Sequence, residues 1–135
     1  MAAWKTNLKP YIPSGSRKFS GYYVDGDIPA GIFSYSIPAE MTSESLFMFL
    51  EGADKWTTHS RITANEWRFV ANQRNPMTFD DLFVIWISPI NSVVLVNSLV
   101  DSPNEYLALP ELYDEARKVA TKLAGGEGDG VSEPE

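Results

Sequence analysis

The only histidine of the chain, His59, lies in the polar run from Thr57 to Ser60. An imidazole beside hydroxyl groups could act as a general base that activates a nucleophile. Such a relay also needs an orienting acid, for which Asp54 and Glu66 are available. No Gly-x-Ser-x-Gly motif accompanies the histidine, and a lone histidine in a polar run is more often structural or solvated. The sequence therefore predicts no catalytic residue.

Two pairs of carboxylates, Asp25 with Asp27 and Asp80 with Asp81, could hold a hard cation such as Ca²⁺ or Mg²⁺. Neither pair is followed by the bidentate glutamate of a calcium loop, and turn and helix-cap chemistry explains both pairs better. The chain has no cysteine and one histidine, which disfavours zinc. The glycine-rich segment 125–130 lacks the Lys-Ser/Thr of a phosphate loop. No metal and no cofactor is predicted.

Four aromatic residues, Tyr22, Tyr23, Phe33 and Tyr35, could stack nucleic-acid bases from one face of a sheet. The basic residues that would track phosphates are few, and the net charge of the chain is −7. Nucleic-acid binding is therefore disfavoured. No small-molecule substrate is identified.

Charge is distributed unevenly along the chain. Residues 1–18 hold four basic and no acidic residues, whereas residues 101–135 hold nine acidic and three basic residues. Because complementary charge guides association, the basic segment of one copy could bind the acidic end of another. The alternative is that both ends are simply solvated. The predicted interaction residues are Trp4, Lys5, Lys9, Tyr11, Arg17, Lys18, Glu111, Asp114 and Glu115.

The elements that position these residues are organised around residues 82–100, which contain no charge. A membrane span needs about 20 apolar residues, but Pro89 and Asn91 interrupt this run with turn-forming and polar groups. Two strands, Leu82–Ile87 and Ser92–Val100, are therefore predicted in place of a span. The lack of polar alternation in the first strand indicates that it is covered on both faces.

Three further strands are predicted. Residues 19–24 and 32–37 flank a turn rich in Asp and Gly and should pair as a hairpin, and residues 55–62 form another strand. A helix capped by Thr42 or Ser43 should extend to about Glu51. A second helix is predicted from Leu109 to about Leu123, with acids near its start and bases near its end.

Residues 64–74 can be interpreted in two ways. The pattern from Thr63 to Glu66 matches a capping box and predicts a helix that ends near Asn75. The alternative is a strand that places Trp67 and Phe69 on one face.

Together these elements predict an α+β fold with an antiparallel or mixed sheet of about five strands and two or three covering helices. Residues 1–18 are expected to form an extended basic arm, 19–123 a single globular domain, and 124–135 a flexible acidic tail. No signal peptide is evident, so the expected location is the cytoplasm, that of a host cell if the protein is viral, or the virion itself.

The expected function is that of a non-enzymatic structural or assembly protein that packs with copies of itself or into a larger particle, such as a bacteriophage virion. A homo-oligomer or particle neighbours are the expected partners. One alternative is a small acidic accessory protein that binds and inhibits a partner enzyme by imitating DNA. Another is a small enzyme that uses His59.

Overall fold

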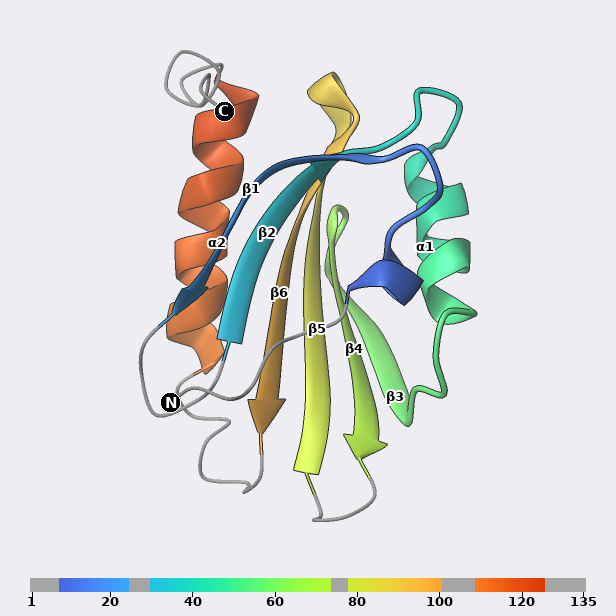
Figure 1. The fold of residues 1–135 in the computed structure, drawn as a ribbon, viewed down its shortest axis with the longest axis vertical. Coiled ribbons are helices and arrows are strands. Elements are labelled where there is room, and N and C mark those ends of the chain that lie inside the picture. Colours follow the sequence, from blue (N-terminus) through green and yellow to red (C-terminus); the bar gives the residue numbers. More distant parts are fainter. Residues whose placement is uncertain (1–7, 25–29, 74–77, 101–108, 126–135) are drawn as a thin grey trace.

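The computed structural model describes residues 8–24, 30–73, 78–100 and 109–125. These residues form six strands, two α-helices and two short 3-10 helices (Figure 1). In chain order the elements are η1 (Lys9–Tyr11), β1 (Arg17–Val24), β2 (Ala30–Ser36), α1 (Ser43–Glu51), β3 (Thr58–Thr63), β4 (Glu66–Gln73), β5 (Thr78–Ile87), η2 (Ser88–Ile90), β6 (Ser92–Val100) and α2 (Leu109–Ala124).

All six strands belong to one sheet, in the spatial order β1-β2-β6-β5-β4-β3. Every neighbouring pair is antiparallel. The predicted α+β class is therefore confirmed, and the sheet has one strand more than the expected number. The two strands from the charge-free run, β5 and β6, lie at its centre, while β1 and β3 form its edges.

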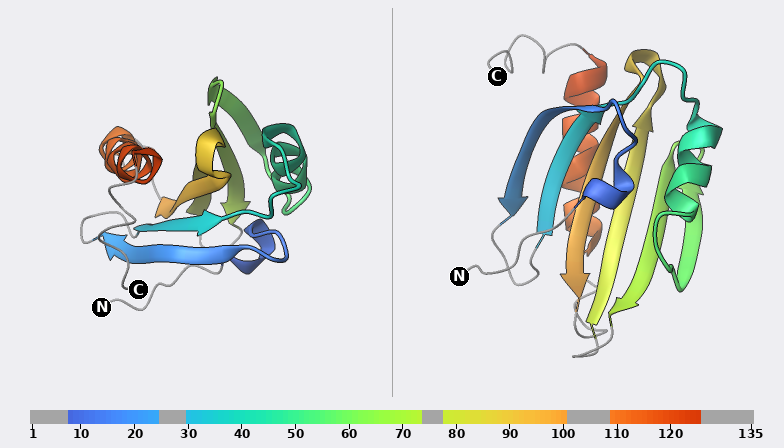
Figure 2. Two further views of the ribbon diagram at one scale, coloured as in Figure 1. Left: turned by 90° about the horizontal axis from the view of Figure 1, so that it is seen from above. Right: turned by 45° about the vertical axis from the view of Figure 1, so that its right-hand side comes forward.

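Helices cover both faces of the sheet (Figure 2). α2 lies on one face, and α1 and η1 lie on the other. Side chains along β5 alternate between these layers, because Phe83 and Ile85 join the cluster under α2, whereas Leu82 and Val84 join the cluster under α1. All four are buried. The prediction that this strand is covered on both faces is thus confirmed.

The charge-free run divides where the sequence indicated. Ser88–Ile90 forms η2, and Asn91 follows with a φ of 48°, in the left-handed region that asparagine tolerates. The Asn91 amide donates hydrogen bonds of 2.8 Å to the carbonyl oxygens of Ile37 and Pro38, which fixes the turn to the end of β2. In the part of the chain that is described, neither helix is long and apolar enough to cross a membrane.

The helices predicted after Thr42 and from Leu109 are both present. α1 begins after Thr42, whose hydroxyl accepts a hydrogen bond from the Ser45 amide at 3.1 Å, while the Ser45 hydroxyl accepts one from the Thr42 amide at 2.8 Å. This reciprocal cap satisfies two backbone donors at the start of the helix. α2 spans the expected residues and buries one face against β5 and β6.

The preferred helix over residues 64–74 is wrong, and the alternative strand is correct. Residues Glu66–Gln73 form β4, and Thr63 and Glu66 flank the turn of the β3–β4 hairpin instead of capping a helix. Apolar residues at alternate positions of β4 are the signal that favours a strand, since Trp67 and Phe69 are both fully buried under α1. Pairing with β5 along the whole strand outweighs the local capping signal.

The described part of the expected extended arm, residues 8–18, packs against the sheet. Leu8 and Tyr11 lie in the cluster beneath α1, and each is less than 10% exposed. The Tyr11 hydroxyl donates a 2.7 Å hydrogen bond to Asp54. Arg17 and Lys18 then begin β1. The buried side chains of Leu8 and Tyr11, together with η1, therefore hold this basic segment against the folded domain.

Candidate functional site

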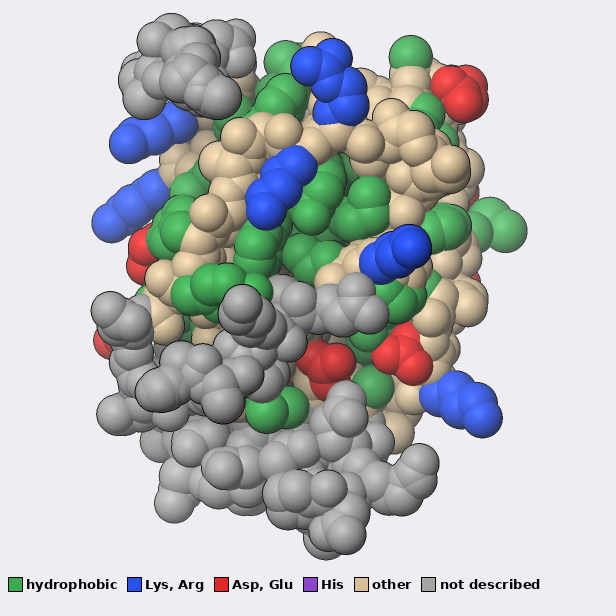
Figure 3. Space-filling model, in the orientation of Figure 1, with side chains coloured by type: hydrophobic (Ala, Val, Ile, Leu, Met, Phe, Trp, Pro, Cys, Tyr) green, Lys and Arg blue, Asp and Glu red, His purple; other side chains and the backbone are tan. Residues whose placement is uncertain are grey.

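A groove of about 390 Å³ opens over β1 and β2, on the face that carries η1. It is called the β1–β2 groove below and is lined by Leu8, Lys9, Ile12, Lys18, Tyr23, Phe33 and Tyr35. Figure 3 shows this face, with hydrophobic side chains gathered in a hollow and basic side chains beside it. Its volume lies within the range of ligand-binding pockets.

The strand register explains why these side chains meet. In the β1–β2 hairpin, Lys18 is paired with Tyr35 and Gly21 with Phe33, and Tyr23 is paired with Gly31. Because alternate residues of a strand share a face, the three aromatic rings project from the same side of the sheet. Tyr23 and Phe33 pack edge to face with ring centroids 5.6 Å apart.

Two glycines let the Phe33 ring lie down on the sheet. A Cβ atom on Gly21 would lie 2.3 Å from the ring, and one on Gly31 would lie 2.4 Å from it. Any larger residue at either position would push the ring away. Phe33 consequently forms a buried floor, while Tyr23 remains 46% exposed at its edge.

The groove is basic. Lys9 projects from η1 and Lys18 from β1, and the Lys18 ammonium lies 5.2 Å from the centroid of the Phe33 ring. Among the described residues, none that lines the groove is acidic. Burial raises the pKa of the Tyr35 phenol, with the neighbouring Tyr23 adding to the effect, so this hydroxyl stays neutral. The groove therefore suits an anion that carries an apolar group.

The predicted basic interaction residues are only partly assembled here. Lys9 and Lys18 line the groove, whereas Arg17 is exposed at the start of β1 and is not one of the lining residues. Tyr11 is buried and serves the core instead. Trp4 and Lys5 lie outside the described residues, as do Asp25 and Asp27.

The predicted acidic residues are on α2, on the opposite face. Glu111 and Asp114 are exposed, but Asp114 accepts a 2.8 Å hydrogen bond from Arg117. Glu115 accepts a 2.9 Å hydrogen bond from Tyr22, whose pKa is raised to about 12 by burial together with this bond. Two of the three acids thus have partners within the chain.

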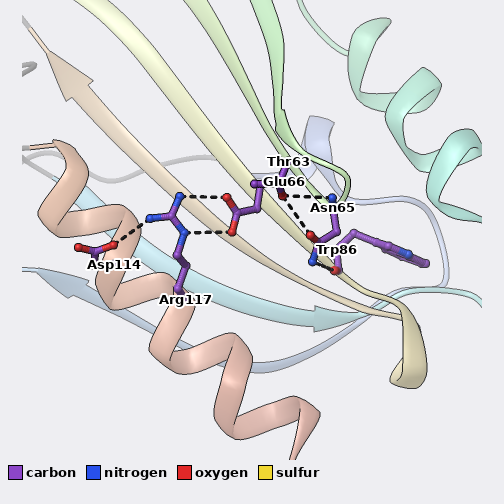
Figure 4. Close-up of polar contacts among 6 residues, drawn as sticks. All are labelled: Thr63, Asn65, Glu66, Trp86, Asp114 and Arg117. Carbon is purple, nitrogen blue, oxygen red and sulfur yellow. Dashed lines mark hydrogen bonds and ion pairs between the residues drawn. The ribbon is translucent and has the colours of Figure 1, made fainter.

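A second cavity, of about 520 Å³, lies between the C-terminal half of α2 and the β3–β4 turn. Arg117 spans one wall and forms two hydrogen bonds with Glu66, of 3.0 and 2.9 Å, in addition to its contact with Asp114 (Figure 4). The Asn65 amide beside them donates to the carbonyl oxygen of Trp86 at 3.0 Å. These charged and amide groups already satisfy one another, so they tie α2 to the sheet and do not point to a ligand.

Asp80 and Asp81 were expected in a turn or cap, and this is wrong, because both lie inside β5. They point to opposite faces. Asp81 is fully buried and accepts hydrogen bonds from Arg68 at 2.9 Å and from Tyr113 at 3.0 Å, whereas Asp80 accepts one from Asn97 at 2.6 Å. Burial raises the pKa of both carboxyls, although these donors oppose the effect.

No group of three or more metal-ligating side chains occurs among the described residues. Asp80 and Asp81 bond to protein donors across two different layers, and so do not face a common cation.

His59 lies at the exposed edge strand β3. Its Nε2 is 3.3 Å from a Glu51 carboxylate oxygen, and its ring packs near Phe47 and Phe69. Within the described segments, no serine or threonine hydroxyl hydrogen-bonds to this imidazole. The carboxylate beside His59 is thus that of Glu51, which the sequence did not single out, and the described residues place no hydroxyl nucleophile against the imidazole.

The four aromatic residues considered for base stacking do not share one surface. Tyr23, Phe33 and Tyr35 line the groove, but Tyr22 faces α2. Sequence reasoning missed that three of them combine with Lys9 and Lys18. The signal was the position of Gly21 and Gly31 around Phe33 in the hairpin, which marks a close approach of a side chain to the backbone.

The chain matches no protein-family model, no curated protein and no solved structure. Its function must therefore be argued from the geometry of its own surface.

Proposed function

We propose that this protein is a non-enzymatic assembly protein that binds copies of itself, with the β1–β2 groove as its receiving surface. The observation that carries the proposal is a groove lined by aromatic rings and two lysines, with no acid among its described lining residues, on a chain of net charge −7. An acidic chain that presents such a groove is complementary to its own acidic parts. A subunit of a larger particle, such as a bacteriophage virion, would use this kind of contact repeatedly.

The two sheet edges are less suited to self-association. The pairing register shifts between Lys18 and Ser20 at the β1 edge, and between Arg61 and Thr63 at the β3 edge. Register irregularities and basic side chains on edge strands oppose the addition of a further strand. Side-chain contacts at the groove are therefore the better route.

Exposed aromatic side chains on β1 support the same proposal. Phe19 on β1 is 38% exposed and Tyr23 is 46% exposed. Aromatic residues of this kind contribute much of the contact area in protein interfaces. Tyr23 would offer apolar surface to a bound segment while the lysines bind its charge.

The alternative of an acidic inhibitor that imitates DNA has less support. It needs acids spaced across a rigid surface, but Asp114 and Glu115 are engaged with Arg117 and Tyr22. An enzyme based on His59 would need a nucleophile that the described residues do not place beside it.

Size-exclusion chromatography with light scattering tests the proposal. We expect the full chain to increase in mean mass with concentration, and Lys18→Glu to reduce this increase strongly. Lys118→Glu, an equal charge reversal at an exposed position on α2, is the matched control and should resemble the wild type. A wild-type protein that stays monomeric, or a Lys18→Glu protein that associates like the control, would contradict the proposal.

A further inference from the structure

We infer that the occupant of the β1–β2 groove is the acidic segment 126–135 of a second copy of the chain. This inference rests on the self-association proposed above and adds the identity of the bound segment. The groove suits an anionic segment, since Lys9 and Lys18 are its only charged lining residues among those described.

The composition of segment 126–135 fits this requirement. It holds four acids and no base, and no other window of ten residues in the sequence contains four acids. The acids are Glu127, Asp129, Glu133 and Glu135. Val131 lies between them and is the aliphatic side chain available to contact Phe33 and Tyr35. The segment thus offers an apolar group flanked by carboxylates, which is the chemistry that the groove favours.

The second copy follows from the self-association proposed above, and the position of α2 is compatible with it. α2 ends at Ala124 on the face of the sheet opposite to the groove (Figure 2). A segment leaving this helix would have to pass around the sheet to reach the groove of its own chain. The groove of a neighbouring copy imposes no such path.

The resulting contact joins two different surfaces. Such a heterologous contact leaves one groove and one acidic segment unused at the ends of any open assembly. Copies would therefore continue to add until a ring closes, or would form an open chain. This is a geometry that a particle component can use.

Peptide binding provides the first test. A synthetic peptide of residues 126–135 with an N-terminal fluorophore is titrated with the full chain, and fluorescence anisotropy is recorded. We expect saturable binding that weakens about tenfold or more with Lys9→Glu or Lys18→Glu and changes little with Lys118→Glu, because only the first two reverse a charge at the groove. A peptide with glutamine and asparagine in place of the four acids should not bind. Equal binding of both peptides would overturn the inference.

Two different lysine variants keep this test decisive. Lys18 also contacts the Phe33 ring, so circular dichroism must show that Lys18→Glu remains folded. If it does not, Lys9→Glu on η1 still reverses a groove charge. Unaltered peptide affinity in the folded Lys9→Glu protein would argue against the groove as the binding site.

Sedimentation velocity of the full chain separates failure of this inference from failure of the proposed function. The variant carries Glu127→Gln, Asp129→Asn, Glu133→Gln and Glu135→Gln. We expect it to remain monomeric where the wild type associates. If it associates like the wild type while Lys18→Glu does not, the segment is wrong and the groove proposal stands. If the wild type is monomeric but binds the peptide, self-association and the second copy are both contradicted, and only the affinity of the groove for the acidic segment remains. If the wild type is monomeric and binds no peptide, both proposals fall.

Discussion

Two carboxyl groups inside the central strand, one of them fully buried, are the most constrained single residues of this fold. Asp80 and Asp81 sit side by side in the central strand β5 and face opposite layers. Asp81 is completely buried, and its charge is balanced by Arg68, with Tyr113 donating a further hydrogen bond. A buried charge without such partners would be strongly destabilising, so these bonds specify how α2 and β4 meet β5.

Asp80 should make the stability of the protein depend on pH. Its pKa is raised by burial, so the folded state retains the proton to higher pH than the unfolded state does. The stability that Asp80 contributes through this proton is therefore fully present below the ordinary carboxyl pKa. It is lost as the pH rises through the pKa of Asp80 in the folded state.

Asp80→Asn removes this dependence. We expect the stability of the variant relative to the wild type to be more favourable at about pH 7 than at about pH 4, measured by urea denaturation at both values. A difference in unfolding free energy that is the same at both pH values would contradict this role of Asp80.

The ion pair of Glu66 and Arg117 joins α2 to the start of β4. The Glu66 side chain is 12% exposed and accepts both hydrogen bonds from a partner that is 39% exposed. Arg117→Met leaves this carboxylate without its main donor and should reduce the free energy of unfolding by about 1–2 kcal/mol.

Lys118→Met, at the next and exposed position of α2, is the control for Arg117→Met in urea denaturation. Adding Glu66→Gln to Arg117→Met should recover part of the loss, because the stranded charge is then removed. Equal stability of the Arg117→Met and Lys118→Met proteins would show that the ion pair contributes nothing measurable.

At the scale of elements, the groove of the β1–β2 hairpin depends on two positions that carry no side chain. Gly21 and Gly31 leave space that the Phe33 ring fills, and this brings Tyr23 and Lys18 to its edge. The hairpin is thus both a sheet edge and the floor of the proposed receiving surface.

Gly21→Ala tests this construction. The new Cβ atom would lie 2.3 Å from the Phe33 ring, so the ring must move, and we expect a loss of about 1–3 kcal/mol in unfolding free energy. Gly52→Ala is the matched control, because its nearest neighbour would be 3.8 Å away. If urea denaturation gives the same loss for both variants, the close packing of Phe33 is not significant.

Most elements could be predicted from local patterns, and β4 shows where this fails. The hairpin, both helices and the division of the charge-free run follow from turn residues, caps and apolar periodicity. Residues 64–74 carry a helix-cap signal together with strand alternation at Trp67 and Phe69, and only pairing with β5 decides between them. The position of Asp80 and Asp81 inside β5, where Asp81 is fully buried, depends on the same long-range pairing.

At the scale of the whole molecule, the two charged parts of the chain lie on different faces of the sheet, with Lys9 and Lys18 at the groove and the described acids of the C-terminal part on α2. The sequence has a basic beginning and an acidic end, and two of its early lysines, Lys9 and Lys18, line one groove. The glycines around Phe33 signal its close packing, but the meeting of the hairpin aromatics with Lys9 depends on how η1 packs beside the hairpin. Leu8 and Tyr11 fix this packing by entering the core.

Sedimentation velocity of the full chain at low and high salt tests the central claim most directly. If the acidic parts of one copy bind the basic groove of another, the weight-average sedimentation coefficient should rise with protein concentration in about 0.05 M salt. It should fall toward the monomer value in about 0.5 M salt, where charges are screened over a few ångströms. A monomer at every concentration in low salt, or association that salt does not weaken, would contradict the account.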